Sequence, residues 1–338
     1  MEKNFVVYQT VGSEEAGQRL DNYLFRYLKG VPKSHVYRIL RGGEVRVNKK
    51  RAEAAYRIRE GDLIRLPPLR RAERATVAEH PAPLLTLPVV HEDTVLLAID
   101  KPAGLAAHGG SGVSFGVIET LRRQRPEAKF LELAHRLDKE TSGLLLIGKK
   151  RSALNALHDL FRAAGRQVDK RYVILVRGRW MNPVQQVKLP LLKYLTESGE
   201  RRVRVDALGK FSHTEFRLLA RWRQVSLLEA RLLTGRTHQL RVQLAHLGFP
   251  ILGDEKYGDF ALNKALAKKG LLKRMALHAA RLTCPHPLAA ESRLVLESPL
   301  PEALAAFIAH LDATETREVS IGDASCKIPF SLPKPEQS

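Results

Sequence analysis

The run His135-Arg136-Leu137-Asp138-Lys139-Glu140-Thr141-Ser142-Gly143 stands directly before the apolar run Leu144-Leu145-Leu146-Ile147. A short apolar run is typical of a buried strand, so the polar run is expected to form a loop that a sheet holds in place. Loops on a rigid scaffold often carry catalytic groups. An isolated Arg-x-Asp pair is more often part of a salt-bridged surface turn, however, and only the rest of the chain decides between these two interpretations.

Strand-like segments are frequent on both sides of this run. They are residues 95–99, 144–147, 172–176, 202–205, 214–219 and 225–233. Between them, residues 152–166 have apolar side chains at helical spacing. Because strands follow one another too often for repeated βαβ units, we predict an α+β domain built on a mixed, largely antiparallel β-sheet.

A proline-rich stretch separates this domain from an N-terminal segment. Its prolines are Pro67, Pro68, Pro81, Pro83 and Pro88. Proline fixes φ and removes a backbone donor, so this stretch is unsuited to a helix or a central strand and is interpreted as a linker. We predict a small domain over residues 17–79, a linker over 80–89, a second domain over 90–310, and a tail over 311–338 to which no function is assigned.

The small domain contains two apolar repeats with the spacing of short helices. They are formed by Leu20, Leu24 and Leu28, and by Val36, Ile39 and Leu40. Gly42-Gly43 is expected to end the second helix, and alternating apolar and polar residues predict strands over residues 44–48, 56–59 and 63–66. The predicted unit is therefore two helices packed on a small sheet.

The charge balance indicates a polyanionic partner. The chain has 56 Lys and Arg against 36 Asp and Glu, a net charge of +20. No apolar run has the length of a membrane span, and residues 1–10 lack the apolar stretch of a signal peptide, so we predict a cytoplasmic protein without a membrane partner. The two cysteines, Cys284 and Cys326, lie far apart and away from any Cys/His cluster, so neither a disulfide framework nor a metal site is predicted.

A cluster of six cations lies in the small domain. It consists of Lys33, Arg38, Arg41, Lys49, Lys50 and Arg51. Such a cluster either tracks a phosphate backbone or forms a solvated basic face, and composition alone favours neither. Residues 17–21, 34–38 and 43–48 resemble an S4 (α-L) domain, a family that binds structured RNA through its second helix and the adjoining strand. The resemblance implies that the six cations contact RNA.

The nine residues 135–143 resemble the signature of the pseudouridine synthase family that includes ribosomal and transfer-RNA enzymes. Further segments resemble the same family in the expected order: residues 101–104 with His108, residues 169–172, and residues 235–258. The resemblance spans residues 90–300. It implies a catalytic domain of the pseudouridine synthase type that isomerises uridine in RNA and requires no cofactor or metal.

The resemblance also implies roles for individual side chains. Asp138 is expected to be the catalytic carboxylate, which stabilises positive charge on the sugar or forms a covalent intermediate. Arg241 is expected to orient Asp138 and keep it ionised. Tyr172 is expected to stack on the target base and assist a proton transfer. Arg136 is expected to enter the RNA stack when the uridine is flipped out.

Two further residues of the distal motif, Arg236 and His238, are expected to contact phosphate or to order the loop. A purely structural interpretation stays open for each of the other side chains. Tyr172 would then be a strand core residue, Arg136 an ordinary phosphate contact, and Arg241 one more cation in a basic, RNA-facing strand.

Other functional classes fit the sequence less well. The glycines from Gly109 to Gly112 have the wrong spacing for a nucleotide-binding fingerprint. A methyltransferase with an S4 domain would need a cofactor-binding βα unit, which the sequence does not indicate. A glycosidase that uses Asp138 and Glu140 would have both carboxylates on one short loop instead of on opposite sides of a cleft. A noncatalytic RNA-binding protein is the alternative from a different class.

The RNA substrate is predicted from two short segments, residues 29–34 and 108–112, which resemble family members that act on large-subunit ribosomal RNA. We expect that RNA, free or within a ribosome assembly intermediate, to be the partner of a monomeric enzyme. Transfer RNA or another RNA is the alternative substrate.

Overall fold

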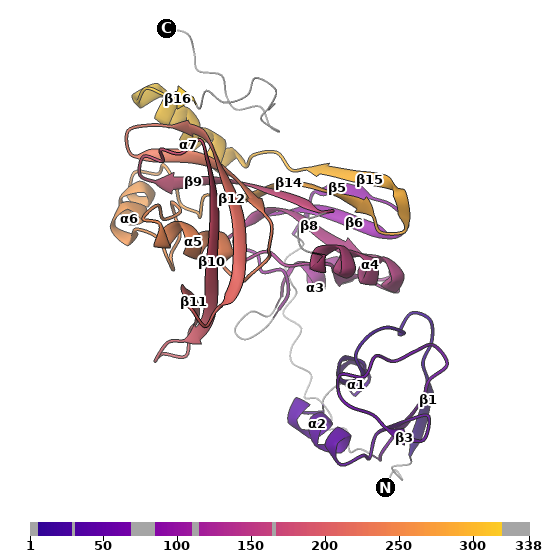
Figure 1. Ribbon diagram of the computed structural model, residues 1–338. Helices are drawn as coiled ribbons and strands as arrows, with labels where there is room; N and C mark the ends of the chain where they lie inside the picture. The colour runs from indigo at the N-terminus through magenta and orange to yellow at the C-terminus, as the bar shows by residue number, and fades with distance from the viewer. Residues whose placement is uncertain (1–5, 29–30, 69–84, 110–114, 164–166, 320–338) are drawn as a thin grey trace. The chain divides into compact units, whose positions relative to one another are not determined.

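The computed structural model describes residues 6–28, 31–68, 85–109, 115–163 and 167–319. The chain divides into two compact units, Met1–Pro83 and Leu84–Ser338, and each is described by itself (Figure 1). Cys326 and parts of the predicted linker and tail lie outside the described residues, as do parts of the segments 29–34 and 108–112.

In its described part, the N-terminal unit contains two helices and a four-stranded antiparallel sheet. The helices are α1 (Leu20–Tyr27) and α2 (Lys33–Arg41), and the strand order is β1 (Val7–Thr10), β4 (Leu63–Leu66), β2 (Arg46–Val47), β3 (Lys50–Arg51). All six apolar residues of the two predicted helical repeats are buried in one cluster. The helices therefore form because each covers the same core with one apolar face.

The sheet of this unit differs from the prediction in several places. The predicted strand over residues 44–48 stops at Val47, because Asn48 and Lys49 have φ of 50° and 69° and form the two-residue turn into β3. Residues 56–59 form only an isolated bridge, between Arg57 and Arg19. Their backbone instead bonds to the chain around the start of α1, since the Ile58 N–H donates to the Gln18 carbonyl at 3.0 Å. Strand β1 was not predicted, and it lies ahead of residue 17.

The C-terminal unit is built on a mixed sheet of 12 described strands. Their order is β11-β10-β12-β13-β9-β14-β8-β6-β5, with β15 beside β14, β16 beside β12 and β7 beside β8. The strands are β5 (Val89–Glu92), β6 (Leu96–Lys101), β7 (Glu132–Leu133), β8 (Ser142–Gly148), β9 (Asp169–Arg177), β10 (Val184–Leu195), β11 (Arg201–Val205), β12 (Lys210–Arg221), β13 (Val225–Leu232), β14 (Leu277–His286), β15 (Ala289–Glu297) and β16 (Glu318–Val319). Among the described pairs, only β14 with β8 is parallel. The predicted α+β class with a mixed, largely antiparallel sheet is confirmed.

Five described helices accompany this sheet. They are α3 (Val117–Gln124), α4 (Arg151–Arg162), α5 (Gln239–His246), α6 (Phe260–Lys268) and α7 (Glu302–Thr314). Helix α7 continues past residue 310, where the tail was predicted to begin, because Leu311 extends the buried face that includes Leu304. Strand β16 lies further along and pairs with β12. Regular secondary structure in this unit therefore extends into the predicted tail.

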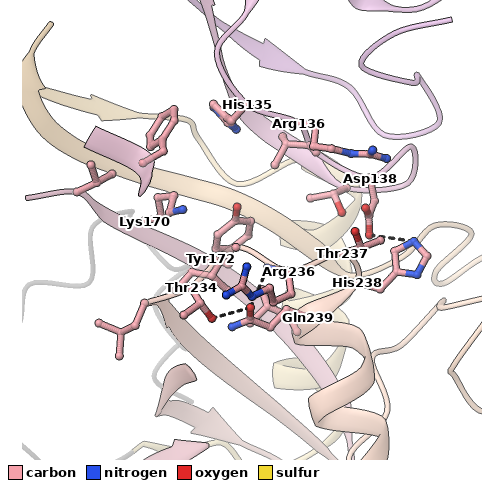
Figure 2. A pocket seen from close by; sticks show the side chains of 18 of the residues that line it. His135, Arg136, Asp138, Lys170, Tyr172, Thr234, Arg236, Thr237, His238 and Gln239 are labelled. Atoms are coloured by element: carbon pink, nitrogen blue, oxygen red, sulfur yellow. Dashed lines mark hydrogen bonds and ion pairs between the residues drawn. The ribbon is translucent and has the colours of Figure 1, made fainter. Parts of the chain in front are cut away.

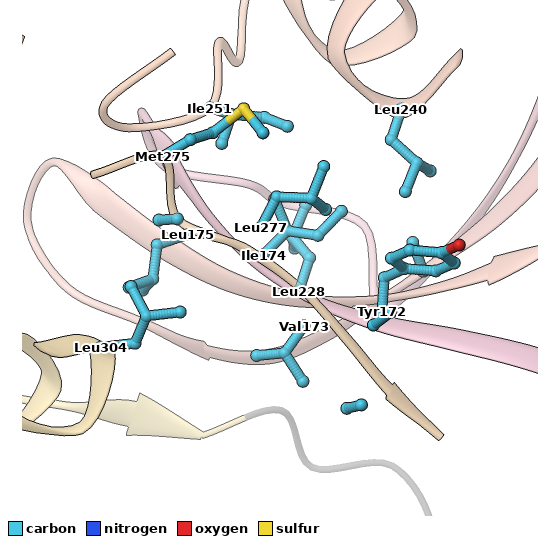
Figure 3. Packing of buried hydrophobic residues seen from close by; sticks show 14 of the residues in the cluster. Tyr172, Val173, Ile174, Leu175, Leu228, Leu240, Ile251, Met275, Leu277 and Leu304 are labelled. Carbon is cyan, nitrogen blue, oxygen red and sulfur yellow. The ribbon is translucent and has the colours of Figure 1, made fainter. Parts of the chain in front are cut away.

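The main core lies around β9, which pairs with β13 on one side and β14 on the other. Figure 3 shows apolar side chains from these strands packed with Leu240 of α5 and Leu304 of α7. Full burial of such a side chain contributes roughly 1.5–3 kcal/mol, so the centre of the sheet is a rigid support. Tyr172, only 8% exposed, lies at one end of this cluster.

The polar loop of residues 135–143 is attached to the sheet by a close backbone contact. Gly143 has φ of +108°, and a Cβ at this position would lie 2.3 Å from the carbonyl oxygen of Ala279 on β14. Only glycine allows this approach together with this φ. The last residue of the polar run thus permits the parallel pairing of β8 with β14, and the preceding residues are held at the edge of that pairing.

Candidate active site

A pocket of about 470 Å³ opens beside the start of β9 (Figure 2). Its walls come from residues 134–138 and Thr141, from the end of α4, from Lys170 and Tyr172 on β9, and from residues 232–241. This volume is in the usual range for sites that enclose a small molecule or one unit of a polymer. The pocket thus brings together residues from the segments 135–143, 169–172 and 235–258, which lie far apart in the sequence.

Asp138, Arg241 and Asp254 form a buried chain of charges at this pocket. The Arg241 Nη1 donates to Asp138 Oδ2 at 3.2 Å, and its Nε and Nη2 each donate to Asp254 at 2.7 Å. Arg241 is 5% exposed and Asp254 1%, whereas the Asp138 side chain is 19% exposed. The guanidinium is therefore fixed from behind by one carboxylate while it holds the other at the pocket wall.

Arg241 and Asp254, the two more deeply buried members of this chain, stabilise each other's charged form. Burial opposes the charge on Arg241, but the hydrogen bonds and charges of Asp254 and Asp138 outweigh it and raise the pKa of Arg241 above its usual value. Burial likewise works against ionised Asp254, yet the Arg241 guanidinium and the N–H groups of Lys256 and Tyr257 hold the pKa of Asp254 below its usual range. Asp254 lies within residues 235–258, but the sequence predicts no role for it, because nothing in the sequence places it against Arg241.

His238 lies next to Asp138 in a strained backbone position. Its φ is 53°, a left-handed value that costs a non-glycine residue about 1–3 kcal/mol. Its Nδ1 lies 2.8 Å from the Tyr257 hydroxyl, and its Nε2 lies 3.8 Å from Asp138 Oδ2. Burial lowers the pKa of His238 below its usual value, which favours a neutral ring. The Tyr257 ring also lies 5.2 Å from the Arg241 guanidinium carbon.

Tyr172 is both a residue of the buried core and part of the pocket wall. The two locations that the sequence offered as alternatives therefore apply together. Burial, with a contribution from the charge of Asp138, raises the pKa of Tyr172 above its usual value, so the phenol stays protonated at neutral pH. Arg136 and Arg236 line the pocket with exposed side chains, and Arg236 Nε donates to the Phe211 carbonyl at 3.0 Å.

The six cations predicted to contact RNA belong to the N-terminal unit. All of them are exposed there, on α2, in the β2–β3 turn and on β3. None forms an ion pair within the described residues of this unit, although Lys33 Nζ lies 5.3 Å from the centre of the Phe25 ring. Their charges thus remain accessible to a ligand.

Lys101 stabilises the Asp138 loop through its buried ammonium group, a role that the sequence did not reveal. Its Nζ is fully buried and donates to the carbonyl oxygens of Pro102 at 2.7 Å, Leu105 at 2.8 Å and Lys139 at 3.0 Å. Burial lowers the pKa of Lys101 to about 7. The ammonium group ties the turn after β6 to the turn that follows Asp138.

His278 forms a second buried connection under the same loop. Its Nδ1 lies 2.9 Å from Ser142 Oγ, and its Nε2 lies 3.2 Å from the Ser298 carbonyl oxygen. Arg274 Nη2 donates to Ser142 Oγ at 2.6 Å, so Ser142 in turn can donate to His278. These partners suit a neutral imidazole, and burial lowers the pKa of His278 to about 4.

Protonation of His278 should make the free energy of unfolding depend on pH. Because its pKa is lower when folded (about 4) than when unfolded (6.5), the unfolded state binds more protons between these pH values. This shift in the pKa of His278 is therefore expected to lower the free energy of unfolding by about 3 kcal/mol as pH drops from 6.5 to 4, and the buried His135, whose pKa burial also lowers, adds to the fall. Urea titrations at several pH values would measure it. His278→Gln should flatten this dependence and the exposed His108→Gln should not; equal slopes for both variants would contradict the assignment.

Neither a metal cluster nor a membrane-spanning helix is found in the part of the chain that the structure describes. No group of three or more histidine, cysteine or acidic side chains there is arranged to hold a metal ion. No helix there combines the length and the apolar character that crossing a bilayer requires.

Comparison with known proteins identifies the family of each domain. A family model described as RNA pseudouridylate synthase matches residues 95–246, and one described as S4 domain matches residues 18–64. The ribosomal large subunit pseudouridine synthase C of Salmonella typhimurium is 50% identical over 299 residues, which cover 87% of this chain and 93% of that protein. The protein of the same name from Pasteurella multocida is 48% identical over 300 residues, covering 86% and 89%.

Solved structures show the same fold. Human RNA pseudouridylate synthase domain containing 4 superimposes with a TM-score of 0.54 at 28% identity, over 66% of this chain and 92% of that one. Human RNA pseudouridylate synthase domain containing 1 gives a TM-score of 0.56 at 24% identity, over 72% and 94%. The shared fold, the two matched family models and the high identity to full-length relatives lead to one conclusion: the chain belongs to the RNA pseudouridylate synthase family and carries an S4 domain ahead of its synthase domain.

Proposed function

We propose that this RNA pseudouridine synthase modifies uridines in large-subunit ribosomal RNA and that Asp138 is its catalytic carboxylate. The observation that carries the catalytic assignment is the contact between Asp138 Oδ2 and Arg241 Nη1 at 3.2 Å, on a guanidinium that Asp254 holds in place. The substrate is supported by relatives about half identical to this chain and named ribosomal large subunit pseudouridine synthase C.

The reaction breaks the bond from C1′ to N1 of uridine, turns the base and joins C1′ to C5. A hydrogen leaves C5 and N1 gains one, so the reaction has no net redox change. Positive charge develops on the sugar as the first bond breaks, and an anionic carboxylate stabilises it. Asp138 serves this step either by bonding to C1′ or by removing a sugar proton. Both routes need a carboxylate held at a fixed place in the pocket, and the Arg241 contact at 3.2 Å supplies that placement.

The other pocket residues are assigned to binding and orientation. Tyr172 presents its ring to the uracil, and its hydroxyl can relay the proton that C5 loses by releasing its own proton to water as it accepts the new one. Arg136, exposed at the pocket beside Asp138, replaces the stacking that the flipped uridine leaves, offsetting an unstacking cost of a few kcal/mol. Arg236 and His238 order the loop around Asp138 and contact the RNA backbone.

The proposed substrate and setting are specific. The enzyme acts as a monomer in the cytoplasm, on large-subunit ribosomal RNA that is either free or in an assembly intermediate. The test is to incubate the purified protein with unmodified transcripts of large-subunit ribosomal RNA and of transfer RNAs, and to map pseudouridine in each. We expect new pseudouridines in the ribosomal transcript and none in the transfer RNAs. Modification confined to transfer RNA would overturn the substrate assignment.

The S4 cations should supply RNA affinity without taking part in the chemistry. Each neutralised phosphate contact changes the slope of log Kd against log salt concentration by about 0.7–0.9. The combined change of Lys33, Arg38 and Arg41 to Gln is therefore expected to reduce that slope by about 2–3. The value of kcat at saturating RNA should stay unchanged, which serves as the control for an intact pocket. An unchanged salt slope would remove RNA binding from this face.

A further inference from the structure

Lys170 is a cation of the pocket that the reaction as described above does not use. It lies on β9 two residues before Tyr172, so both side chains point to the same face of the strand. Figure 2 shows them extending from β9 into the pocket, with Tyr172 between Lys170 and Asp138 in this view. The spacing of alternate residues along a strand is about 6–7 Å, which is short enough for one nucleotide to contact both.

The ammonium group of Lys170 is half-buried and has no anion beside it among the residues that the structure describes. It lies 5.4 Å from the centre of the Phe161 ring, and it forms no hydrogen bond or ion pair within the described residues. The neighbouring carboxylate of Asp169 is already occupied by Arg171 at 2.8 Å and Arg231 at 3.2 Å. Burial lowers the pKa of Lys170, with no opposing contribution from a nearby acid.

The groups around Lys170 leave its charge uncompensated. His135 Nε2 accepts a hydrogen bond from the Leu146 N–H at 3.1 Å, and burial lowers the pKa of His135 to about 3, so this ring is neutral. The Phe161 ring packs against the His135 ring in an edge-to-face contact. A desolvated cation in such surroundings binds an anion strongly, because water competes weakly there.

We infer that Lys170 binds a backbone phosphate adjacent to the uridine that occupies the pocket. This inference rests on the proposed function, which puts a single nucleotide of an RNA strand between Tyr172 and Asp138. The phosphate is the anion that every RNA strand carries beside each sugar. A lysine at this place fixes the nucleotide from the side opposite Asp138, and so sets the position of C1′ relative to the carboxylate. Lys170 is a positioning residue in this scheme.

Lys170→Met tests the charge while it keeps the length of the side chain that packs on Phe161. The substrate is a short RNA from the large subunit containing a uridine that the wild-type enzyme modifies. It is made with all phosphates, or with one neutral methylphosphonate on the 5′ or 3′ side of that uridine. In the wild-type enzyme one of the two replacements should lower kcat/KM by about 10- to 100-fold, the range for hydrogen bonds to charged groups.

The variant should show the same loss with the normal RNA, and little further loss with the methylphosphonate, because both changes remove one contact. Its salt slope for binding should fall by about 0.7. Lys170→Arg should retain most of the activity, and Lys269→Met, an exposed lysine outside the pocket, should behave as wild type.

Two outcomes would overturn the inference, and they are distinguishable. If the wild-type enzyme is active but the losses from Lys170→Met and from each methylphosphonate multiply, Lys170 has only a structural role. If the wild-type enzyme forms no pseudouridine in large-subunit RNA, the proposed function fails, and the assignment of Lys170 fails with it. Thermal unfolding of Lys170→Met beside wild type would confirm that both samples are folded.

Discussion

Asp138→Asn is expected to abolish pseudouridine formation, with kcat/KM lowered on the order of 10⁴-fold or more, as when an enzyme loses its nucleophile. The amide has the shape of the carboxylate but carries no charge, so it neither stabilises a cationic sugar nor removes a proton. The Asp138 side chain is 19% exposed, and the change should leave the fold intact. Pseudouridine mapping and single-turnover kinetics on the same ribosomal transcript would measure the effect.

Glu140→Gln is the matched control for this prediction. Glu140 lies on the same loop but does not line the pocket, so its variant should stay within about tenfold of wild type. RNA binding by Asp138→Asn should also be retained, since the S4 cations and the arginines at the pocket are unchanged. Equal modification by Asp138→Asn and wild type would show that the carboxylate is not catalytic and would favour a noncatalytic role in RNA binding.

Arg241→Met is expected to remove activity and to lower the free energy of unfolding by about 3–5 kcal/mol, the usual cost when one partner of a buried ion pair is lost. The cost arises because Asp254, 1% exposed, would keep a charge without its two hydrogen bonds from the guanidinium. Urea unfolding followed by circular dichroism would measure the stability, and the kinetic assay would measure the activity.

Two comparisons separate the structural from the catalytic part of this effect. Arg236→Met removes an exposed arginine of the same motif, and its stability should stay within about 0.5 kcal/mol of wild type. Combining Arg241→Met with Asp254→Asn removes both buried charges while the amide oxygen still accepts from the Lys256 and Tyr257 N–H groups. This double variant should regain much of the stability but none of the activity. Wild-type stability in Arg241→Met alone would contradict the buried-pair account.

Much of the fold could be predicted because it depends on local patterns. The leucine repeat that begins at Leu20 predicted α1, and the apolar run after Gly143 predicted β8. The errors also have local causes. Asn48 and Lys49 adopt positive φ, which the alternating pattern of a strand does not reveal. Residues 56–59 alternate like a strand but bond to the chain near α1 instead of to a sheet neighbour.

The candidate site was predicted less completely than the fold. The sequence motifs identified Asp138, Tyr172 and Arg241, and the structure brings these three residues to one pocket. The supporting residues Lys101 and Asp254 were within quoted segments, but their roles depend on partners distant in sequence. Helix α5 is buried on nearly every side, so it shows no amphipathic pattern that would mark Arg241 as an inward-facing residue.

The sequence by itself determined the class of this protein: a basic chain, an RNA-binding domain before an α+β domain, and a polar run around Asp138 that matches a family of RNA isomerases. Only the tertiary structure decided how that acid is held. Asp138 and Arg241 are 103 residues apart, and Asp254 reaches the same guanidinium from beyond the end of α5. Hydrogen bonds of this kind depend on distances between separate elements, and those distances exist only once the sheet has formed around β9.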